Sequence, residues 1–179
     1  KVDVNGIGIG YDIIGDGKRR IAITAGGRFS KDTPGLRELA AELVKGGDYR
    51  VLIWDRPNCG ESDICFDAPT ESLMNADAFA GLLKAIDFGP ALLVGGSAGS
   101  RVSLMTAIRH PDLVSGLFLL WISGGPIGLA TLAMHYCAGS ALAAEMEGME
   151  AVANLPEWQE QITRNPGNRA RILAQDPDK

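Results

Sequence analysis

The stretch Ala91-Leu92-Leu93-Val94-Gly95-Gly96-Ser97-Ala98-Gly99 decides the fold of this chain. Its four apolar residues predict a buried strand, and the residues from Arg101 to His110 follow a helical pattern that Pro111 ends. A strand that runs straight into a helix forces a tight turn with a strained central residue, and small flanking residues let that turn approach its neighbours. We therefore predict that Ser97 sits on such a turn, at the carboxyl end of a sheet where α/β proteins bind ligands.

The serine of this turn is a candidate nucleophile. A helix N-terminus favours developing negative charge, and the N–H group of Ala98 is placed to bind an oxyanion. The alternative is that Ser97 only caps the helix in a glycine-rich turn. Ser100 competes less well because it lies one step into the helix. A phosphate-binding loop is excluded because no Lys-Ser/Thr pair follows the glycines.

Strands alternate with helices on both sides of this turn. Several strands are apolar along their whole length, which indicates a sheet that is covered on both faces. The pattern predicts the α/β class, with a mostly parallel sheet and helices on each side of it. We expect a hairpin turn at Asn5-Gly6. The expected strands are 1–4, 7–14, 19–25, 49–54, 91–95 and 113–122, and the expected helices are 36–45, 70–86 and 97–110.

The character of the sequence changes near Ser123–Pro126. Residues 124–179 contain no strand pattern and are typical of helices joined by loops. We therefore expect an α/β core over residues 1–123 and a helical segment over residues 124–179. The apolar run 113–122 is broken by Gly124-Gly125-Pro126, so it is too short to span a membrane and is typical of a buried strand.

Composition narrows the classes of function. The chain has 179 residues, a formal net charge of -5, 46% hydrophobic residues and 22% charged residues, which fits a globular core and excludes a disordered chain. The acidic balance argues against nucleic-acid binding. Three cysteines without a CxxC pair and two distant histidines indicate neither a disulfide framework nor a zinc site. We expect no metal, no cofactor, no membrane partner and a reducing, cytoplasmic location.

Two further segments are candidates at the same edge of the sheet. Gly26-Gly27-Arg28 follows the first parallel strand, and the N–H group of Gly27 is a candidate second oxyanion donor, although a plain turn explains the glycines equally well. Gly26 and Arg28 are candidates for substrate contact. The polar residues of Asp55–Asp63 either contact substrate or tie their loop down by internal hydrogen bonds, and we favour the second interpretation.

Four landmarks together resemble the α/β-hydrolase superfamily of serine esterases, lipases, peptidases and C–C bond hydrolases. In chain order they are the Val4-Asn5-Gly6 hairpin with Tyr11 and Gly15-Asp16-Gly17, the Gly26-Gly27 turn, the Asp55–Asp63 loop and the turn around Ser97. The resemblance covers roughly residues 1–123. It implies an incomplete α/β-hydrolase fold, followed by the start of the helical cap that covers the substrate pocket in that family. Ala25-Gly26 stands where the family usually has His-Gly.

A serine nucleophile needs a base, and the base needs an orienting carboxylate. In the family the acid and the histidine follow later strands, which this sequence lacks. His110 lies a helix length away from Ser97, and His135 falls in the expected cap, where it is a candidate for substrate contact. We therefore expect the histidine and the acid outside this segment, in a C-terminal remainder or a second chain. The alternative is a short homologue that has lost catalysis.

These features lead to a functional hypothesis. The resemblance and the turn imply a serine hydrolase that acts on an ester, or on a C–C bond adjacent to a carbonyl, with Ser97 as nucleophile and Gly27 and Ala98 as oxyanion donors. Its partner is then a small-molecule substrate. The alternative is a non-catalytic protein of the same fold that binds a ligand or another protein. Whether the protein forms a homo-oligomer stays open.

Overall fold

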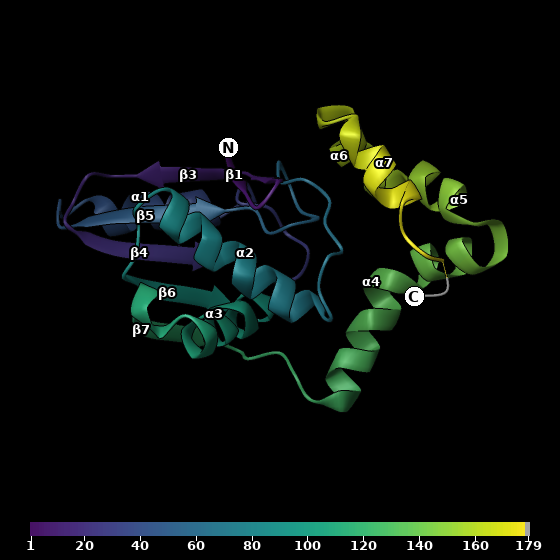
Figure 1. Ribbon diagram of the computed structural model, residues 1–179. Helices are drawn as coiled ribbons and strands as arrows, with labels where there is room; N and C mark the ends of the chain where they lie inside the picture. The colour runs from purple at the N-terminus through teal and green to yellow at the C-terminus, as the bar shows by residue number, and fades with distance from the viewer. Residues whose placement is uncertain (178–179) are drawn as a thin grey trace.

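The computed structural model describes residues 1–177, which contain a five-stranded sheet (Figure 1). Strands β4, β5, β6 and β7 run parallel, and β3 runs antiparallel to β5, so the predicted mostly parallel sheet is confirmed. The strands, in the spatial order of the sheet, are β3 (Tyr11–Ile14), β5 (Tyr49–Trp54), β4 (Arg19–Thr24), β6 (Ala91–Gly96) and β7 (Val114–Leu120).

A small hairpin precedes the sheet. Strands β1 (Val2–Val4) and β2 (Ile7–Ile9) pair around Asn5 and Gly6, which both have positive φ, as the turn type favoured in two-residue hairpins requires. The prediction of one strand over 7–14 was wrong, because the chain leaves the hairpin at Gly10 and enters the sheet as β3. At Gly10 the N–H group donates to Ser62 Oγ (3.0 Å) and the carbonyl accepts from the Asp55 N–H (2.9 Å), so a loop replaces the strand partner.

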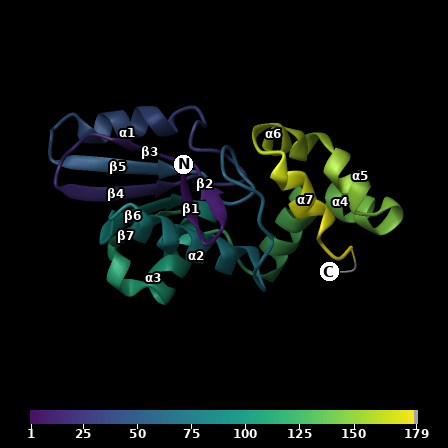
Figure 2. The same ribbon diagram turned by 45° about the horizontal axis from the view of Figure 1, so that its top comes forward.

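Helix α1 (Leu36–Val44) covers one face of the sheet, which Figure 2 shows edge-on. Alternate residues of β4 and β5 point to this face, as the two-residue period of a strand requires. They pack with the helix in a small apolar cluster, whose buried members are Ile21, Ile23, Ala40, Val51 and Ile53.

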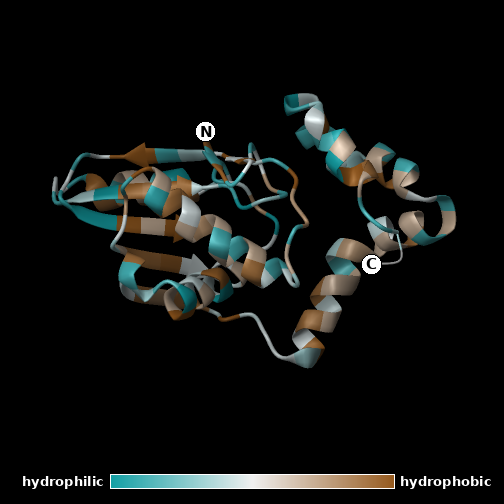
Figure 3. Cartoon of the chain, in the orientation of Figure 1, coloured by the Kyte–Doolittle hydropathy of each residue, from teal (hydrophilic) through white to brown (hydrophobic). Residues whose placement is uncertain are grey.

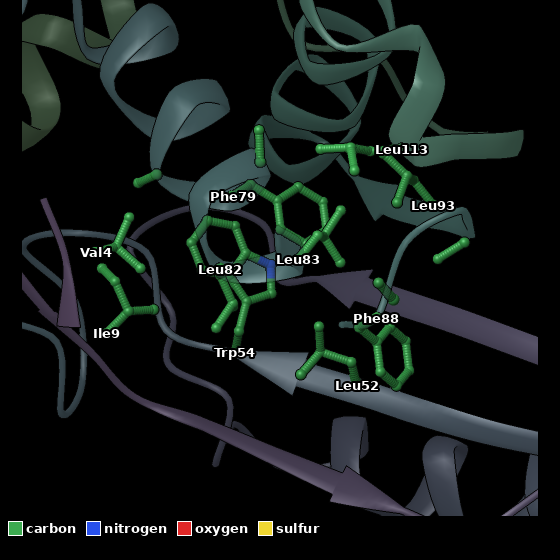
Figure 4. Close-up of a cluster of buried hydrophobic side chains, with 14 of the residues drawn as sticks. Val4, Ile9, Leu52, Trp54, Phe79, Leu82, Leu83, Phe88, Leu93 and Leu113 are labelled. Atoms are coloured by element: carbon green, nitrogen blue, oxygen red, sulfur yellow. The ribbon is translucent and has the colours of Figure 1, made fainter. Parts of the chain in front are cut away.

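Helices α2 (Glu71–Ala85) and α3 (Ala98–Arg109) cover the opposite face, so helices lie on both sides of the sheet as predicted. The larger core lies here (Figure 4). Trp54 stacks on Phe79 with ring centroids 4.6 Å apart, and its indole N–H donates to Thr24 Oγ1 at 2.9 Å. Trp54 therefore adds a satisfied polar group to a large buried aromatic contact.

Four helices follow β7 and lie beyond the carboxyl ends of the parallel strands (Figure 1). We call them the α4–α7 segment. They have an apolar cluster of their own, which includes Val152, Ala153, Trp158 and Ile172, together with Ile64 from the loop after β5. Their bounds are α4 (Pro126–Glu147), α5 (Met149–Asn154), α6 (Pro156–Arg164) and α7 (Gly167–Leu173).

Polar contacts join the α4–α7 segment to the loop after β5. Asn165 Nδ2 donates to Asp63 Oδ1 (2.8 Å), and the Ile64 N–H donates to Asn168 Oδ1 (3.1 Å). Arg171 donates to the Ile64 carbonyl (3.0 Å). Asp63 also accepts from Lys1 Nζ and from the Gly8 N–H, so one buried carboxylate links the N-terminal hairpin to the helices.

Strand β7 differs from the prediction of a buried strand over residues 113–122. It has a neighbour on one side only, because it is the edge of the sheet in residues 1–177. Its apolar side chains are therefore partly uncovered, with Phe118 56% exposed, and the following Trp121 is 83% exposed. The apolar run was correctly assigned to a strand, but its composition did not indicate how many neighbours that strand has.

Helix α4 is apolar along most of its length (Figure 3). Among residues 1–177 it is the helix that is long and apolar enough to cross a membrane, by length and composition alone. None of its residues is buried, and Ile127, Met134 and Met146 are among its exposed side chains. Length and composition are weak grounds by themselves, so the expectation of no membrane partner stays a prediction.

The link through Asp63 predicts a pH-dependent contribution to stability. Burial raises the pKa of Asp63, but hydrogen bonds from Lys1, Asn165 and the Gly8 N–H outweigh it and leave the pKa lowered. A lowered carboxyl pKa stabilises the folded state above the unfolded pKa of about 3.9, and the contribution is lost as pH falls through the folded pKa. Asp63→Asn should therefore lower the free energy of unfolding by about 1–3 kcal/mol at pH 7.

Urea unfolding of the protein between pH 3 and pH 7 measures this effect. The difference between wild type and Asp63→Asn should stay constant above about pH 5 and shrink below about pH 4. Asp48→Asn is the matched control, because that side chain is exposed. A difference that is the same at every pH would contradict the ionic role of Asp63.

Candidate active site

Ser97 occupies the tight turn that the sequence predicted between β6 and α3. Its backbone has φ 53° and ψ −114°, a positive φ that non-glycine residues rarely adopt and that typically costs 1–3 kcal/mol. The Ser97 N–H donates to the Leu120 carbonyl at 2.8 Å, which holds the turn against the end of β7. The Ser97 hydroxyl has no hydrogen-bond partner within residues 1–177, and it lies at the N-terminus of α3.

Two glycines allow this turn to form. A Cβ added at Gly95 would lie 2.3 Å from the Gly99 carbonyl oxygen, and one added at Gly99 would lie 2.2 Å from the Thr24 carbonyl oxygen. Real Cβ atoms do not approach backbone that closely, so neither position accepts a side chain. The end of β6, the start of α3 and the end of β4 are therefore packed backbone against backbone.

The Gly26–Gly27 turn lies beside Ser97. A Cβ added at Gly26 would be 3.0 Å from the Gly96 carbonyl oxygen and 3.4 Å from Ser97 Cβ. Gly27 has φ 46°, and a Cβ there would approach Tyr136 and Phe29. The structure thus brings together Ser97, Ala98, Gly26 and Gly27, as the sequence predicted from the order of the strands.

Arg56 holds the carbonyl groups of this turn. Its guanidinium donates to the carbonyl oxygens of Gly26 (3.2 Å) and Gly27, and the residue is only 3% exposed. In a trans peptide the C=O and N–H bonds point in opposite directions. With both carbonyls turned toward Arg56, the N–H groups of Gly27 and Arg28 point away from it. No sequence pattern indicated this contact, because Arg56 is separated from the two glycines by 30 and 29 positions in the chain.

Asp55 fixes the loop from which Arg56 extends. Its carboxylate is fully buried and accepts from the backbone N–H groups of Lys31 (2.6 Å) and Glu61 (2.9 Å). Burial raises the pKa of Asp55, although the two N–H donors and the Lys31 charge oppose that shift. Ser62 Oγ donates to the Asp55 carbonyl at 2.6 Å. The polar residues of this loop therefore tie it down, which is the interpretation that the sequence favoured.

Lys31 is a buried residue whose ion pairs also hold these loops together, and the sequence analysis did not identify it. Its ammonium group lies 2.9 Å from Asp32, 3.3 Å from Asp12 and 3.4 Å from Glu61. Burial lowers the pKa of Lys31, but its carboxylate partners, Asp32 and Asp12 foremost, outweigh burial and raise it. The loop after β4 is thereby held to β3 and to the loop after β5.

Ser100 has a structural role. Its hydroxyl lies within hydrogen-bond distance of the Gly95 carbonyl (2.6 Å) and the Leu120 carbonyl (2.8 Å), and the residue is fully buried. It therefore bridges β6, α3 and the end of β7 and is not available as a nucleophile. The choice between Ser97 and Ser100 made from the sequence agrees with this geometry.

Neither histidine forms a hydrogen bond with the Ser97 hydroxyl in residues 1–177. His110 follows α3, and the twelve residues of that helix separate it from Ser97 by about 18 Å at 1.5 Å per residue. Its Nε2 pairs with Asp77 at 2.9 Å, beside a two-point contact between Asp77 and Arg109. His135 is in α4, where its ring meets the edge of the Tyr136 ring at 4.7 Å.

Two cavities lie between the loops after β4 and β5 and the α4–α7 segment. The first has about 750 Å³ and is lined by residues that include Arg28, Phe29, His135 and Tyr136. The second has about 840 Å³ and a more apolar lining, which includes Phe66, Ala144, Met149 and Val152. Arg28 and Tyr136 line both, and either volume is in the range of small-molecule sites. The structure thus places two predicted contact residues, Arg28 and His135, on a cavity wall.

This arrangement can support acyl chemistry. A serine hydroxyl at a helix N-terminus next to exposed N–H groups is suited to a reaction in which negative charge develops on a carbonyl oxygen. In residues 1–177 no group of three or more histidine, cysteine or carboxylate side chains is arranged to hold a metal ion.

Curated proteins with related sequences are hydrolases. The chain is 31% identical to a 2-hydroxy-6-oxo-6-phenylhexa-2,4-dienoate hydrolase of Comamonas testosteroni, over 75% of this chain and 44% of the relative. It is 30% identical to the sn-1-specific diacylglycerol lipase ABHD11 of Mus musculus, over 96% of this chain and 50% of the relative. The chain therefore spans about half the length of these relatives.

Solved structures share the fold. A thermophilic esterase from Thermogutta terrifontis matches with a TM-score of 0.61 at 22% identity, over 98% of this chain and 65% of the esterase. The enol-lactonase from Burkholderia xenovorans LB400 matches with a TM-score of 0.59 at 23% identity, over 95% and 64% of the two chains. A family model described as alpha/beta hydrolase fold matches residues 29–170. The chain therefore belongs to the alpha/beta hydrolase fold family.

Proposed function

We propose that the protein is a serine hydrolase that cleaves a carboxylic ester, or a C–C bond adjacent to a carbonyl, with Ser97 as nucleophile. The observation that carries the proposal is the strained turn that holds Ser97 at the N-terminus of α3, packed against the Gly26–Gly27 turn. A strained non-glycine backbone persists only where the surroundings enforce it, and such strain clusters at functional sites.

In the first step Ser97 Oγ forms a bond to the carbonyl carbon while the carbonyl π electrons move to the oxygen. The N–H groups of Ala98 and Gly27 bind the resulting oxyanion. Support comes from Arg56, whose hydrogen bonds to two carbonyls turn the Gly27 N–H away from it. Donors of this kind are typically worth about 3–4 kcal/mol each in the barrier.

In the second step the tetrahedral intermediate collapses. The bond to the leaving group breaks, the leaving group takes a proton, and an acyl-enzyme remains on Ser97. Water then attacks the acyl carbon through a second oxyanion at the same N–H groups and releases the acid. No step needs a metal or an organic cofactor.

The base that takes the Ser97 proton, and the carboxylate that orients it, are proposed to come from outside residues 1–179, in a C-terminal remainder or a second chain. The location of the histidines supports this proposal: His110 is held by Asp77 at the far end of α3, and His135 contacts Tyr136 on α4. A complete Ser-His-acid set is what the proposed chemistry requires.

We propose further that the α4–α7 segment is a cap over the substrate. The two cavities support that role, because both are lined by Arg28, which follows the Gly26–Gly27 turn, and by Tyr136 of α4. The relatives are named as a dienoate hydrolase and a diacylglycerol lipase, which agrees with the two substrate classes proposed.

Fluorophosphonate labelling tests the nucleophile. In the complete protein the probe should form an adduct on Ser97, and Ser97→Ala should abolish the adduct and lower ester hydrolysis by about a thousandfold or more. Mass spectrometry of the labelled peptide identifies the modified residue.

Ser115→Ala is the control, because this serine is exposed and lies at the start of β7, beside Ala91 and Leu92 at the start of β6. It should label at the wild-type rate. If the complete protein forms no adduct and Ser97→Ala keeps all ester hydrolysis, the protein is instead a non-catalytic binder of the same fold.

Arg56 is predicted to position the oxyanion turn without touching substrate. Arg56→Met should lower kcat for an ester by about tenfold to a hundredfold while KM changes little, because the turn then loses its fixed orientation. Steady-state kinetics on the complete protein measure kcat and KM separately. Guanidinium ion added at millimolar concentration should restore part of kcat in Arg56→Ala.

Arg20→Met is the matched control, because Arg20 also donates to a glycine carbonyl, that of Gly89, on another part of the sheet. It should change kcat by less than about threefold. If Arg56→Met folds and has the kcat of wild type, Arg56 does not position the oxyanion turn.

A further inference from the structure

Arg28 lies beside the proposed oxyanion donor Gly27 and on the walls of both cavities. It follows Gly27 directly, so its Cα lies about 3.8 Å from that of the proposed oxyanion residue. Its side chain lines both cavities. Its contacts are the Cys137 Sγ, at 3.4 Å from Nη2, and the Tyr136 ring, whose centroid lies 5.8 Å from Cζ.

These contacts leave the charge of Arg28 without a carboxylate. Within residues 1–177 Arg28 forms no ion pair, whereas Arg37 and Arg164 on the same side of the molecule each pair with carboxylates. A thiol is a weak hydrogen-bond acceptor, and a phenol ring binds a cation only modestly. The guanidinium therefore keeps most of its capacity to bind an anion.

The carboxylates that line the first cavity are already engaged. Asp32 pairs with Lys31 and Arg37, and Glu160 pairs with Arg164 at 2.6 Å. Glu157 Oε1 accepts from Ser140 Oγ at 3.3 Å. None of these acids forms an ion pair with Arg28.

Arg56 adds a second positive charge at the same turn. It is buried, and its guanidinium donates to the carbonyls of Gly26 and Gly27. Two guanidinium groups thus flank the turn without carboxylate partners in residues 1–177, in a chain whose net charge is -5. Glu145 and Asp176 line the second cavity, so a ligand with one negative charge fits better than a doubly charged phosphate.

We propose that Arg28 binds a carboxylate group of the substrate, so that the enzyme prefers acid-bearing esters or ketones to neutral ones. A guanidinium binds a carboxylate through two parallel hydrogen bonds, which fixes orientation as well as position. The carboxylate lies a few bonds from the reacting carbonyl, because Arg28 is adjacent to Gly27. This inference names the substrate class of the proposed hydrolase and rests on that function.

A matched pair of esters tests the proposal in the complete protein. The mono-4-nitrophenyl ester of glutaric acid and 4-nitrophenyl pentanoate have acyl groups with the same number of carbons, and a carboxylate replaces a methyl in the first. We expect wild-type kcat/KM to favour the glutarate ester by at least about tenfold, as charged hydrogen bonds allow.

Arg28→Gln should lower kcat/KM for the glutarate ester by about tenfold to a hundredfold more than it lowers that for the pentanoate. Arg164→Gln is the matched control, because it removes a guanidinium that lines the first cavity but is paired with Glu160. It should preserve the preference for the glutarate ester.

A binding measurement tests the carboxylate site at Arg28 separately from the proposed hydrolase activity. Free glutarate should bind the catalytically inert Ser97→Ala variant in calorimetry, and Arg28→Gln in that background should weaken binding by at least about tenfold. If both esters are hydrolysed but show no preference that depends on Arg28, the carboxylate site is wrong. If neither ester is hydrolysed and no fluorophosphonate adduct forms, the proposed function fails, while Arg28-dependent glutarate binding would still establish the anion site.

Discussion

The absence of room for a side chain at Gly95 and Gly99 is the constraint on which the site depends. A Cβ at either position would lie 2.2–2.3 Å from a backbone oxygen, so only glycine lets β6, α3 and the end of β4 meet. This close packing gives Ser97 its positive φ and sets the Gly26–Gly27 turn beside it. The geometry of the site is therefore set by packed backbone. Because such packing requires small residues, a short run of them was enough to predict the turn.

Buried polar groups then hold that backbone in place. The Asp55 carboxylate accepts two backbone N–H groups, and Lys31 faces three carboxylates across two loops and an edge strand. Arg56 uses carbonyl oxygens as partners instead of a carboxylate. Removing one partner of a buried charge strongly destabilises the folded state. Each of these contacts therefore favours a single arrangement of the loops. None of these ties supplies a carboxylate partner to the guanidinium of Arg28, which lines both cavities.

Periodicity and turn residues were enough to predict the strands, the helices and the turn at Ser97, because each of these forms within a short stretch of sequence. The alternation of strands with helices then indicated a mostly parallel sheet. Contacts between residues far apart in the sequence could not be predicted in this way. The break at Gly10 arises from Ser62 and Asp55, and the Arg56 contacts span about thirty residues. The link from Asp63 to Asn165 spans 102 positions. A polar residue in a loop indicates that a partner is needed but carries no information on which one, so these ties required the structure.

Helix α4 shows why the cavity wall was the least predictable part of the site. Its apolar residues are spread around the helix, so its sequence does not mark the face that turns toward the cavities. Its contacts with the loop after β4 come from Tyr136 and Cys137, which meet Arg28, and from the approach of the Tyr136 hydroxyl to Gly27. Successive helical residues are rotated by about 100°, so a shift of one residue would carry Tyr136 off this wall. The character of the cavity thus depends on the rotation of α4, which Arg28 itself helps to fix.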